Sequence, residues 1–341
     1  MTDQTYSNGV QQYINKGQAM MDAMARQRAI MRIIVRETSA SERQTLILAT
    51  ETRFDVTVGR STIPNRPPVD WAPESLRTTY LTLDDLPEAH VAGNRELLRL
   101  GQFQEAARDG RLRAGTYSSA QQELAINVED DDPRETIVHE VAHAVDEVMG
   151  WSTGPEPARP ERGGWNSYYR DYDLCAEEMI ADSNAAIQTD LSAAQRQDVI
   201  DEMADAMSNR SAAGLIQAIR DLPWFSGLAE DIRDRVLDDR ALSALEIGLN
   251  TPWFDAENGG EHLGDHVYQE SYPGLWVRYR HEARSRKVSR YQFRDPGEWF
   301  AEAYEFYYRP DERGRGAKLA DKDPDTKRYF DNHVHPLAST R

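Results

Sequence analysis

The chain has 341 residues, of which 39% are hydrophobic and 29% are charged, and it carries a formal net charge of -18 at pH 7. This composition is ordinary for a globular protein, and the length suits one large domain with an elaboration, or two domains. The negative charge argues against nucleic acid and anionic membranes as general partners, because most of the surface would repel their phosphate groups.

Neither membrane insertion nor secretion by the Sec route is expected. No apolar run approaches the roughly 20 residues that a bilayer-spanning helix needs. The N-terminus lacks the basic start and the apolar centre of a Sec signal peptide. The single cysteine, Cys175, excludes internal disulfides and fits a reducing compartment. We therefore expect a protein that is cytoplasmic in the producing cell, or that is exported by another route.

The first hundred residues give a mixed pattern. Residues 10–36 are predicted to form a helix whose methionine-rich stripe packs in a core, with a partner-binding or delivery segment as the alternative. Residues 45–58 fit either a second helix or a pair of strands. Four prolines in 61–73 indicate a loop or linker that ends the N-terminal region. Beyond it, residues 78–83 are strand-like, and 94–107 are predicted as an amphipathic helix.

Two short strands, near 112–117 and 123–128, are expected to precede the most informative helix of the chain. Asp132 suits the N-cap position of this helix, Pro133 its first turn, and Gly150 its end. Apolar residues recur at helical spacing between these limits. The pattern therefore predicts a largely buried helix with one polar side.

That polar side carries the motif His-Glu-x-x-His. His139 and His143 are four residues apart, so on a helix they project from one face, with Glu140 beside them. Random order would produce this motif roughly 0.02 times in a chain of this composition. Two histidines on one helix face are suited to bind zinc, and the glutamate is suited to act as general base. Asp146, three residues after His143, is expected to orient a histidine.

Residues 151–169 are predicted as a loop, and 251–274 as irregular. Between them, the apolar spacing predicts a helical subdomain made of 173–187, 192–207, 212–222 and 228–247. Near the end of the chain, 295–308 is predicted as a helix that is capped by Asp295 and followed by a polar, poorly packed tail.

Seven basic residues fall within 17 positions that contain one acid, Glu282; they are Arg278, Arg280, Arg284, Arg286, Lys287, Arg290 and Arg294. Such a run usually forms a solvated face, and the alternative is a surface that attracts an acidic substrate or partner.

A catalytic zinc site needs a third protein ligand and an open position. The spacing of the metzincin motif is absent, and two glutamates compete. Glu298 lies in SRYQFRDPGEWFAEAY, residues 289–304, seven positions after Tyr291. Together with HEVAHAVD, residues 139–146, this stretch resembles the catalytic domain of the anthrax lethal factor-like zinc metallopeptidases, a gluzincin type that includes the bacterial Pro-Pro endopeptidases.

The resemblance implies His139, His143 and Glu298 as ligands of one catalytic zinc, and Glu140 as the general base. Tyr291 would assist the transition state. Glu302 would contact the ligand residues without binding the metal itself. It also implies an α+β, predominantly helical fold, with a small sheet, the motif helix and a C-terminal glutamate helix. This chain differs from the family in the distance between the two motifs. From His143 to Glu298 it is 298 - 143 = 155 residues, whereas a few tens of residues are usual in the family. An inserted helical subdomain would explain it.

The expected organisation is as follows: a helical N-terminal region at 1–60, the first half of the zincin domain at 74–150, an inserted helical subdomain with loops at 151–275, the second half at 276–310 and a tail at 311–341. The chain is expected to be a zinc endopeptidase that acts on a protein or peptide. A further expectation is that it is a secreted or injected effector or toxin. The sequence does not identify a delivery or immunity partner.

Two alternatives stay open. Glu178, followed four residues later by Asp182, resembles the third-ligand helix of thermolysin-like enzymes and of ArdC-type zincins. A non-enzymatic zinc-fold binding module is the other alternative, although a structural site needs no general base. His262 and His266 are also four apart, but they lie in a glycine-rich stretch and are interpreted as surface or structural residues.

Overall fold

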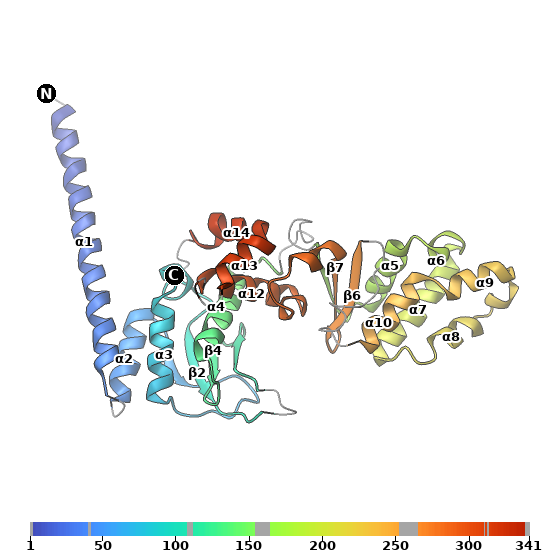
Figure 1. Cartoon of the computed structure of the whole chain (residues 1–341), viewed down its shortest axis with the longest axis horizontal. Coiled ribbons are helices and arrows are strands. Elements are labelled where there is room, and N and C mark those ends of the chain that lie inside the picture. Colours follow the sequence, from blue (N-terminus) through green and yellow to red (C-terminus); the bar gives the residue numbers. More distant parts are fainter. Residues whose placement is uncertain are drawn as a thin grey trace. The chain divides into compact units, whose positions relative to one another are not determined.

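A computed structural model of the chain describes residues 3–39, 42–107, 112–153, 164–251, 265–309, 311 and 314–337. Helices predominate and two small sheets accompany them, which confirms the predicted α+β class (Figure 1). The chain divides into two compact units, the first reaching Val148 and the second running from Met149 to Pro336. Among the described residues, no helix is both long enough and apolar enough to cross a membrane.

Three helices begin the first unit: α1 (Asp3–Glu37), α2 (Arg43–Phe54) and α3 (Pro73–Asp84). They contact one another, and the buried carboxylate of Asp84 holds them together by ion pairs with Arg28, Arg32 and Arg53. The predicted core position of the methionine stripe is wrong for Met20, because that side chain is 64% exposed. Met21 and Met24 are exposed as well.

The predicted strand at 78–83 is also wrong, since these residues belong to α3. Their threonines favour strands in general. Here the hydroxyl groups of Thr79 and Thr82 donate to the carbonyl oxygens of Ser75 and Thr78, each at 2.8 Å, and Pro73 begins the helix. The threonine hydroxyl groups thus find hydrogen-bond acceptors within the helix itself. The same threonines led to the prediction of a strand.

A four-stranded sheet completes this part of the first unit. Its strands are β1 (Thr57–Arg60), β2 (Arg99–Phe103), β3 (Gly115–Ser118) and β4 (Glu123–Asn127), in the order β1-β2-β4-β3. The strand β2 pairs in parallel with β1 on one side and with β4 on the other. The edge strand β3 pairs antiparallel to β4. Because β1 pairs with β2, the sheet links residues on both sides of the proline-rich segment 61–73.

The helix predicted at 94–107 is therefore wrong. Residues 99–103 form the strand β2, of which all but the first residue are buried. The spacing of Leu97, Leu98, Leu100 and Phe103 resembles that of an amphipathic helix. The strand arises instead because β2 lies between β1 and β4 and pairs with both of them, which local periodicity does not reveal.

The motif helix is α4 (Pro133–Met149), which follows β4 as predicted (Figure 1). The side chain of Asp132 accepts from the backbone N–H of Glu135 at 3.2 Å, so it caps the helix. Gly150 has a positive φ of 61° just beyond the last turn, where glycine is favoured.

The second unit contains a three-stranded antiparallel sheet in the order β5-β7-β6. Its strands are β5 (Asn166–Tyr169), β6 (His266–Tyr272) and β7 (Leu275–Arg280). The prediction of loop at 151–169 and irregular chain at 251–274 is wrong for β5 and β6, while 154–163 and 252–264 lie outside the described residues. Pairing of β5 with the distant β7 creates the strand, and no local signal encodes this pairing.

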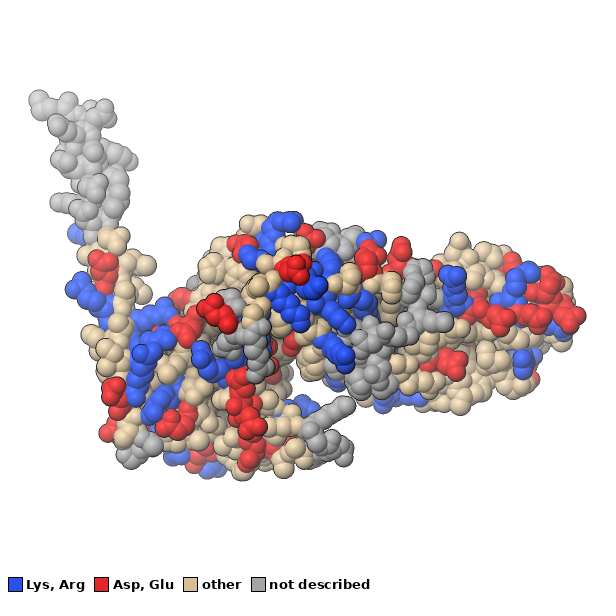
Figure 2. All heavy atoms as spheres, in the orientation of Figure 1, with Lys and Arg blue, Asp and Glu red and all other residues tan. Residues whose placement is uncertain are grey.

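The predicted helical series is confirmed. It consists of α5 (Tyr172–Ser183), α6 (Ala186–Thr189), α7 (Ala193–Asn209), α8 (Leu215–Asp221), α9 (Glu230–Leu237) and α10 (Arg240–Asn250). Acidic side chains gather around α9 (Figure 2). The helices share one apolar core with Tyr168, Tyr268 and Trp276 of the sheet. They are therefore one structural body with the sheet.

The second unit ends with the short turns η4 (His281–Arg286) and η5 (Tyr291–Phe293), the helices α12 (Pro296–Tyr308), α13 (Arg315–Lys322) and α14 (Pro324–Tyr329), and the π-helical turn η7 (Phe330–Val334). The predicted poorly packed tail is wrong, because Leu319, Phe330 and Val334 are buried. The ring of Phe330 packs on Phe300 of α12, with 5.1 Å between the centroids. The ring of Phe330 also contacts Tyr307 of the same helix, at 5.5 Å between the centroids, so one aromatic residue ties this segment to α12.

The basic run of residues 278–294, which begins in β7, is largely engaged within the fold, although it was expected to form a solvated face. Arg284 is buried, with its guanidinium 4.4 Å from the centre of the Phe293 ring. Arg286 lies 3.6 Å from Asp323, and Arg278 lies 2.7 Å from Glu178. Basic side chains are also visible on the surface over the C-terminal segments (Figure 2).

Candidate metal centre

The first half of the site lies on α4. His139 and His143 are half-buried, and their rings meet edge to face with 5.0 Å between the centroids. Neighbouring apolar residues such as Ile137 and Val141 are fully buried, so the helix exposes its histidine face as the periodicity predicted.

Glu140 lies where α4 meets the sheet. A Cβ atom added to Gly115 of β3 would come within 3.2 Å of the Glu140 Cγ and would also collide with Thr136. The missing side chain of Gly115 therefore lets the edge strand approach the helix. Glu140 and Asp146 are both buried on α4, at 8% and 5% exposure, and the predicted orienting role of Asp146 stays a prediction.

The second half of the site lies on α12. Asp295 accepts from the backbone N–H of Glu298 at 3.0 Å and caps the helix, with Pro296 in the first turn. Trp299 is fully buried and stacks on Tyr279 of β7, at 5.8 Å between centroids, and it packs edge to face on Phe293. This aromatic packing anchors the first turn of α12, from which Glu298 projects.

Two tyrosines lie beside the Glu298 carboxylate. The hydroxyl group of Tyr272 donates to Glu298 Oε1 at 3.2 Å. Burial, followed by the negative charge of Glu298, raises the pKa of Tyr272 to about 12. The same two causes, in the same order, raise the pKa of Tyr291 well above its usual value. Tyr291 lies on η5 and is 38% exposed.

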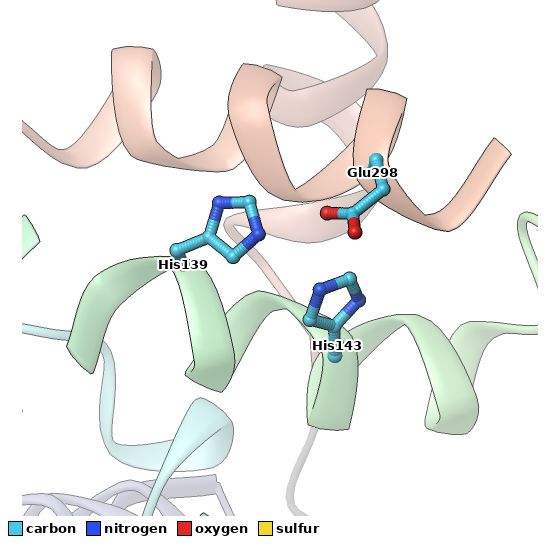
Figure 3. A group of neighbouring side chains, drawn as sticks. All are labelled: His139, His143 and Glu298. Carbon is cyan, nitrogen blue, oxygen red and sulfur yellow. The ribbon is translucent and has the colours of Figure 1, made fainter. Parts of the chain in front are cut away.

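His139, His143 and Glu298 form a group whose potential ligand atoms all lie within 4.8 Å of one another. Their side chains face one another, the histidines from α4 and the glutamate from α12 (Figure 3). Two imidazole nitrogens and one carboxylate oxygen are a donor set that suits catalytic zinc. The residues therefore fit the metal that the sequence predicted.

His139 also belongs to a second group, with Glu302 and Glu305. Glu305 is buried in an ion pair with Arg315, and Arg309 lies 4.0 Å from the same carboxylate. A carboxylate that is already neutralised by arginine is a poorer metal ligand, so the group with Glu298 fits zinc better. Glu302 lies beside His139 in this arrangement, and its supporting role stays a prediction.

Glu178, the alternative third ligand, is engaged in another polar cluster. It accepts from the hydroxyl group of Tyr168 and pairs with Arg278 at 2.7 Å. Arg278 also pairs with Asp182, at 3.2 Å. Among the described residues, neither group of potential ligands that contains His139 includes Glu178.

The same cluster includes His266, whose Nδ1 lies 3.1 Å from Asp182. Tyr268 donates to the same carboxylate at 2.7 Å. His266 therefore has a structural partner, as was expected from the sequence, whereas His262 lies outside the described residues. Tyr272 was not predicted, because its strand looked irregular in sequence and no motif marks it.

Comparison of the chain with family models, curated proteins and solved structures finds no match to any of them.

Proposed function

We propose that the chain is a zinc-dependent endopeptidase with a zincin-type catalytic site, acting on a protein or peptide substrate. One observation carries the proposal: His139, His143 and Glu298, from two distant parts of the sequence, place their ligand atoms within 4.8 Å of one another. The general base predicted by the motif, Glu140, lies on the same helix as the two histidines.

Each residue has a distinct task in this proposal. His139, His143 and Glu298 would hold the ion, which when bound would supply polarisation of the scissile carbonyl and activation of a water molecule. Glu140 accepts a proton from that water molecule and returns it to the leaving amine. The hydroxyl group of Tyr291 donates a hydrogen bond to the carbonyl oxygen as negative charge develops on it.

The alternatives are weaker. A site completed by Glu178 would first have to break the 2.7 Å ion pair with Arg278, which costs more than using a carboxylate that already faces the histidines. A structural zinc module would need neither a general base nor an open position. Delivery into another cell as an effector or toxin is an extension of the proposal that the family resemblance alone supports.

The test combines metal analysis with a cleavage screen. Wild type and the Glu140→Gln variant would be purified with zinc, and each would be incubated with a mixed peptide library whose products are identified by mass spectrometry. We expect one zinc per chain in both proteins and cleavage by wild type only. Zinc binding with no cleavage by wild type of any peptide or denatured protein would support the structural module instead.

A further inference from the structure

The carboxylate of Glu298 is held by a residue outside the predicted motifs. Tyr272 is the last residue of β6, and its hydroxyl group donates to Glu298 Oε1 at 3.2 Å. Glu298 is 7% exposed, so this hydrogen bond lies in an environment with little competing water.

Two features fix the position of Tyr272. The guanidinium of Arg294 stacks on its ring, 3.9 Å from the ring centre, which is a cation–π contact. The pairing of β6 with β7 changes register between Glu270 and Tyr272. Such irregularities often re-aim a side chain beside a functional site.

The strand that carries Tyr272 is also tied to the turn before α12. Gln269 of β6 donates to the backbone oxygen of Phe293 in η5, and Arg284 donates to Gln269 Oε1 at 3.1 Å. The end of β6, the turn η5 and the first turn of α12 are thus connected by specific contacts. A hydroxyl on β6 can therefore define the orientation of a side chain on α12.

We propose that Tyr272 is a positioning residue for the metal site: its hydrogen bond orients the carboxylate of Glu298, an oxygen atom of which lies within 4.8 Å of ligand atoms of His139 and His143. The inference rests on the proposed function, because it assumes that Glu298 is a ligand. A ligating carboxylate without such a partner rotates more freely and changes its binding mode. Hydrogen-bond partners of ligands typically contribute 10- to 100-fold to metal affinity.

The test is Tyr272→Phe, which removes one oxygen atom and keeps the ring under Arg294. Tyr268→Phe is the matched control, because it makes the same change on the same strand, and its hydroxyl group serves Asp182 instead. Zinc affinity would be measured by competition with a chelator. The visible absorption spectrum of the cobalt(II)-substituted protein would report the coordination of the ion.

We expect Tyr272→Phe to bind zinc about 10- to 100-fold more weakly than wild type and to alter the cobalt spectrum. Tyr268→Phe should match wild type in both measurements. At saturating zinc, kcat should fall less in Tyr272→Phe than in Tyr291→Phe. Affinity and spectrum of Tyr272→Phe within twofold of wild type would overturn the inference, as would an equal loss in Tyr268→Phe. Absence of zinc binding by wild type would instead overturn the proposed function.

Discussion

Glu140 is the residue whose role separates catalysis from metal binding most clearly. It shares α4 with the two histidines, yet its proposed task is proton transfer. Replacement by glutamine keeps the shape of the side chain and removes its basicity. We expect Glu140→Gln to keep one zinc per chain and to lose 100-fold or more in kcat, since general bases contribute about 10²–10⁴-fold.

The controls for this prediction are His139→Ala and His143→Ala, which should lose zinc. Metal content by mass spectrometry and initial rates on the peptide identified in the screen are the two measurements. A Glu140→Gln protein that loses zinc as fully as the histidine variants would show that the assignment of base and ligands is incorrect.

Tyr291 is expected to act only when charge develops on the substrate. Tyr291→Phe should keep zinc affinity and KM close to those of wild type, while kcat falls by about 10²-fold or more, as for other donors to a developing oxyanion. Steady-state kinetics at saturating zinc would measure the split. A rise in KM with unchanged kcat would assign Tyr291 to substrate binding instead.

At the residue scale, much of the candidate site could be predicted from sequence. The histidines and Glu140 belong to one local motif, and Glu298 lies at a fixed distance from Tyr291 in a second motif. Tyr272 could not be predicted, because its contact with Glu298 depends on how β6 meets α12 across 26 residues of chain. Residues that position ligands act through tertiary contacts and carry no spacing signal of their own.

The approach of β3 to α4 is the element-scale feature that bears most on Glu140. We expect Gly115→Ala to destabilise the protein by about 1 to 3 kcal/mol and to lower kcat, because the added methyl group would crowd Thr136 and Glu140. Chemical denaturation and steady-state rates would measure the two effects.

Gly59→Ala on β1 is the matched control, since a Cβ atom there meets nothing within 4 Å. It should leave both stability and kcat nearly unchanged. Equal effects of the two substitutions would contradict a specific contact at Gly115.

The contact between α5 and the sheet of the second unit predicts a dependence of stability on pH. Burial alone would raise the pKa of Asp182, but the hydrogen bonds with His266 and Tyr268, together with the positive charges of His266 and Arg278, lower it below its ordinary value of 3.8. A lowered pKa in the folded state stabilises the fold above the unfolded value, and this contribution is lost as the pH falls through the folded pKa. Glu178, Tyr168 and the buried thiol of Cys175 are further titratable groups in this cluster.

Asp182→Asn should therefore destabilise the metal-free protein by about 1 to 3 kcal/mol at pH 5, with a smaller difference from wild type towards pH 3. Asp201→Asn, on the exposed face of α7, is the control and should have little effect at either pH. Urea unfolding at several pH values would measure the differences. A difference that grows as the pH falls would contradict the role of the Asp182 carboxylate.

Elements with a strong local signal were predicted, and those made by tertiary pairing were not. Caps and helical spacing identify α4 and α12. By contrast, the threonines of α3 resemble a strand, and the buried run of β2 resembles a helix. The strand β5 exists because β7 pairs with it, and η7 is held on α12 by contacts of the Phe330 ring with Phe300 and Tyr307.

At the scale of the whole molecule, charge is distributed in a way that a net value of -18 conceals. Several arginines of the basic run, residues 278–294, are engaged by Glu178, Asp182 and Asp323, and by aromatic rings. Composition could not show that these arginines link β7 to α5 through Glu178 and Asp182, and link η4 to Asp323 and to the ring of Phe293.

The central claim is that one zinc ion is held by His139, His143 and Glu298. Zinc titration of wild type, Glu298→Gln and Glu178→Gln tests it most directly, since the two variants make the same change at the two competing carboxylates. We expect one zinc per wild-type chain, an affinity at least about 100-fold weaker in Glu298→Gln, and wild-type affinity in Glu178→Gln. Wild-type affinity in Glu298→Gln, with loss in Glu178→Gln, would contradict the account.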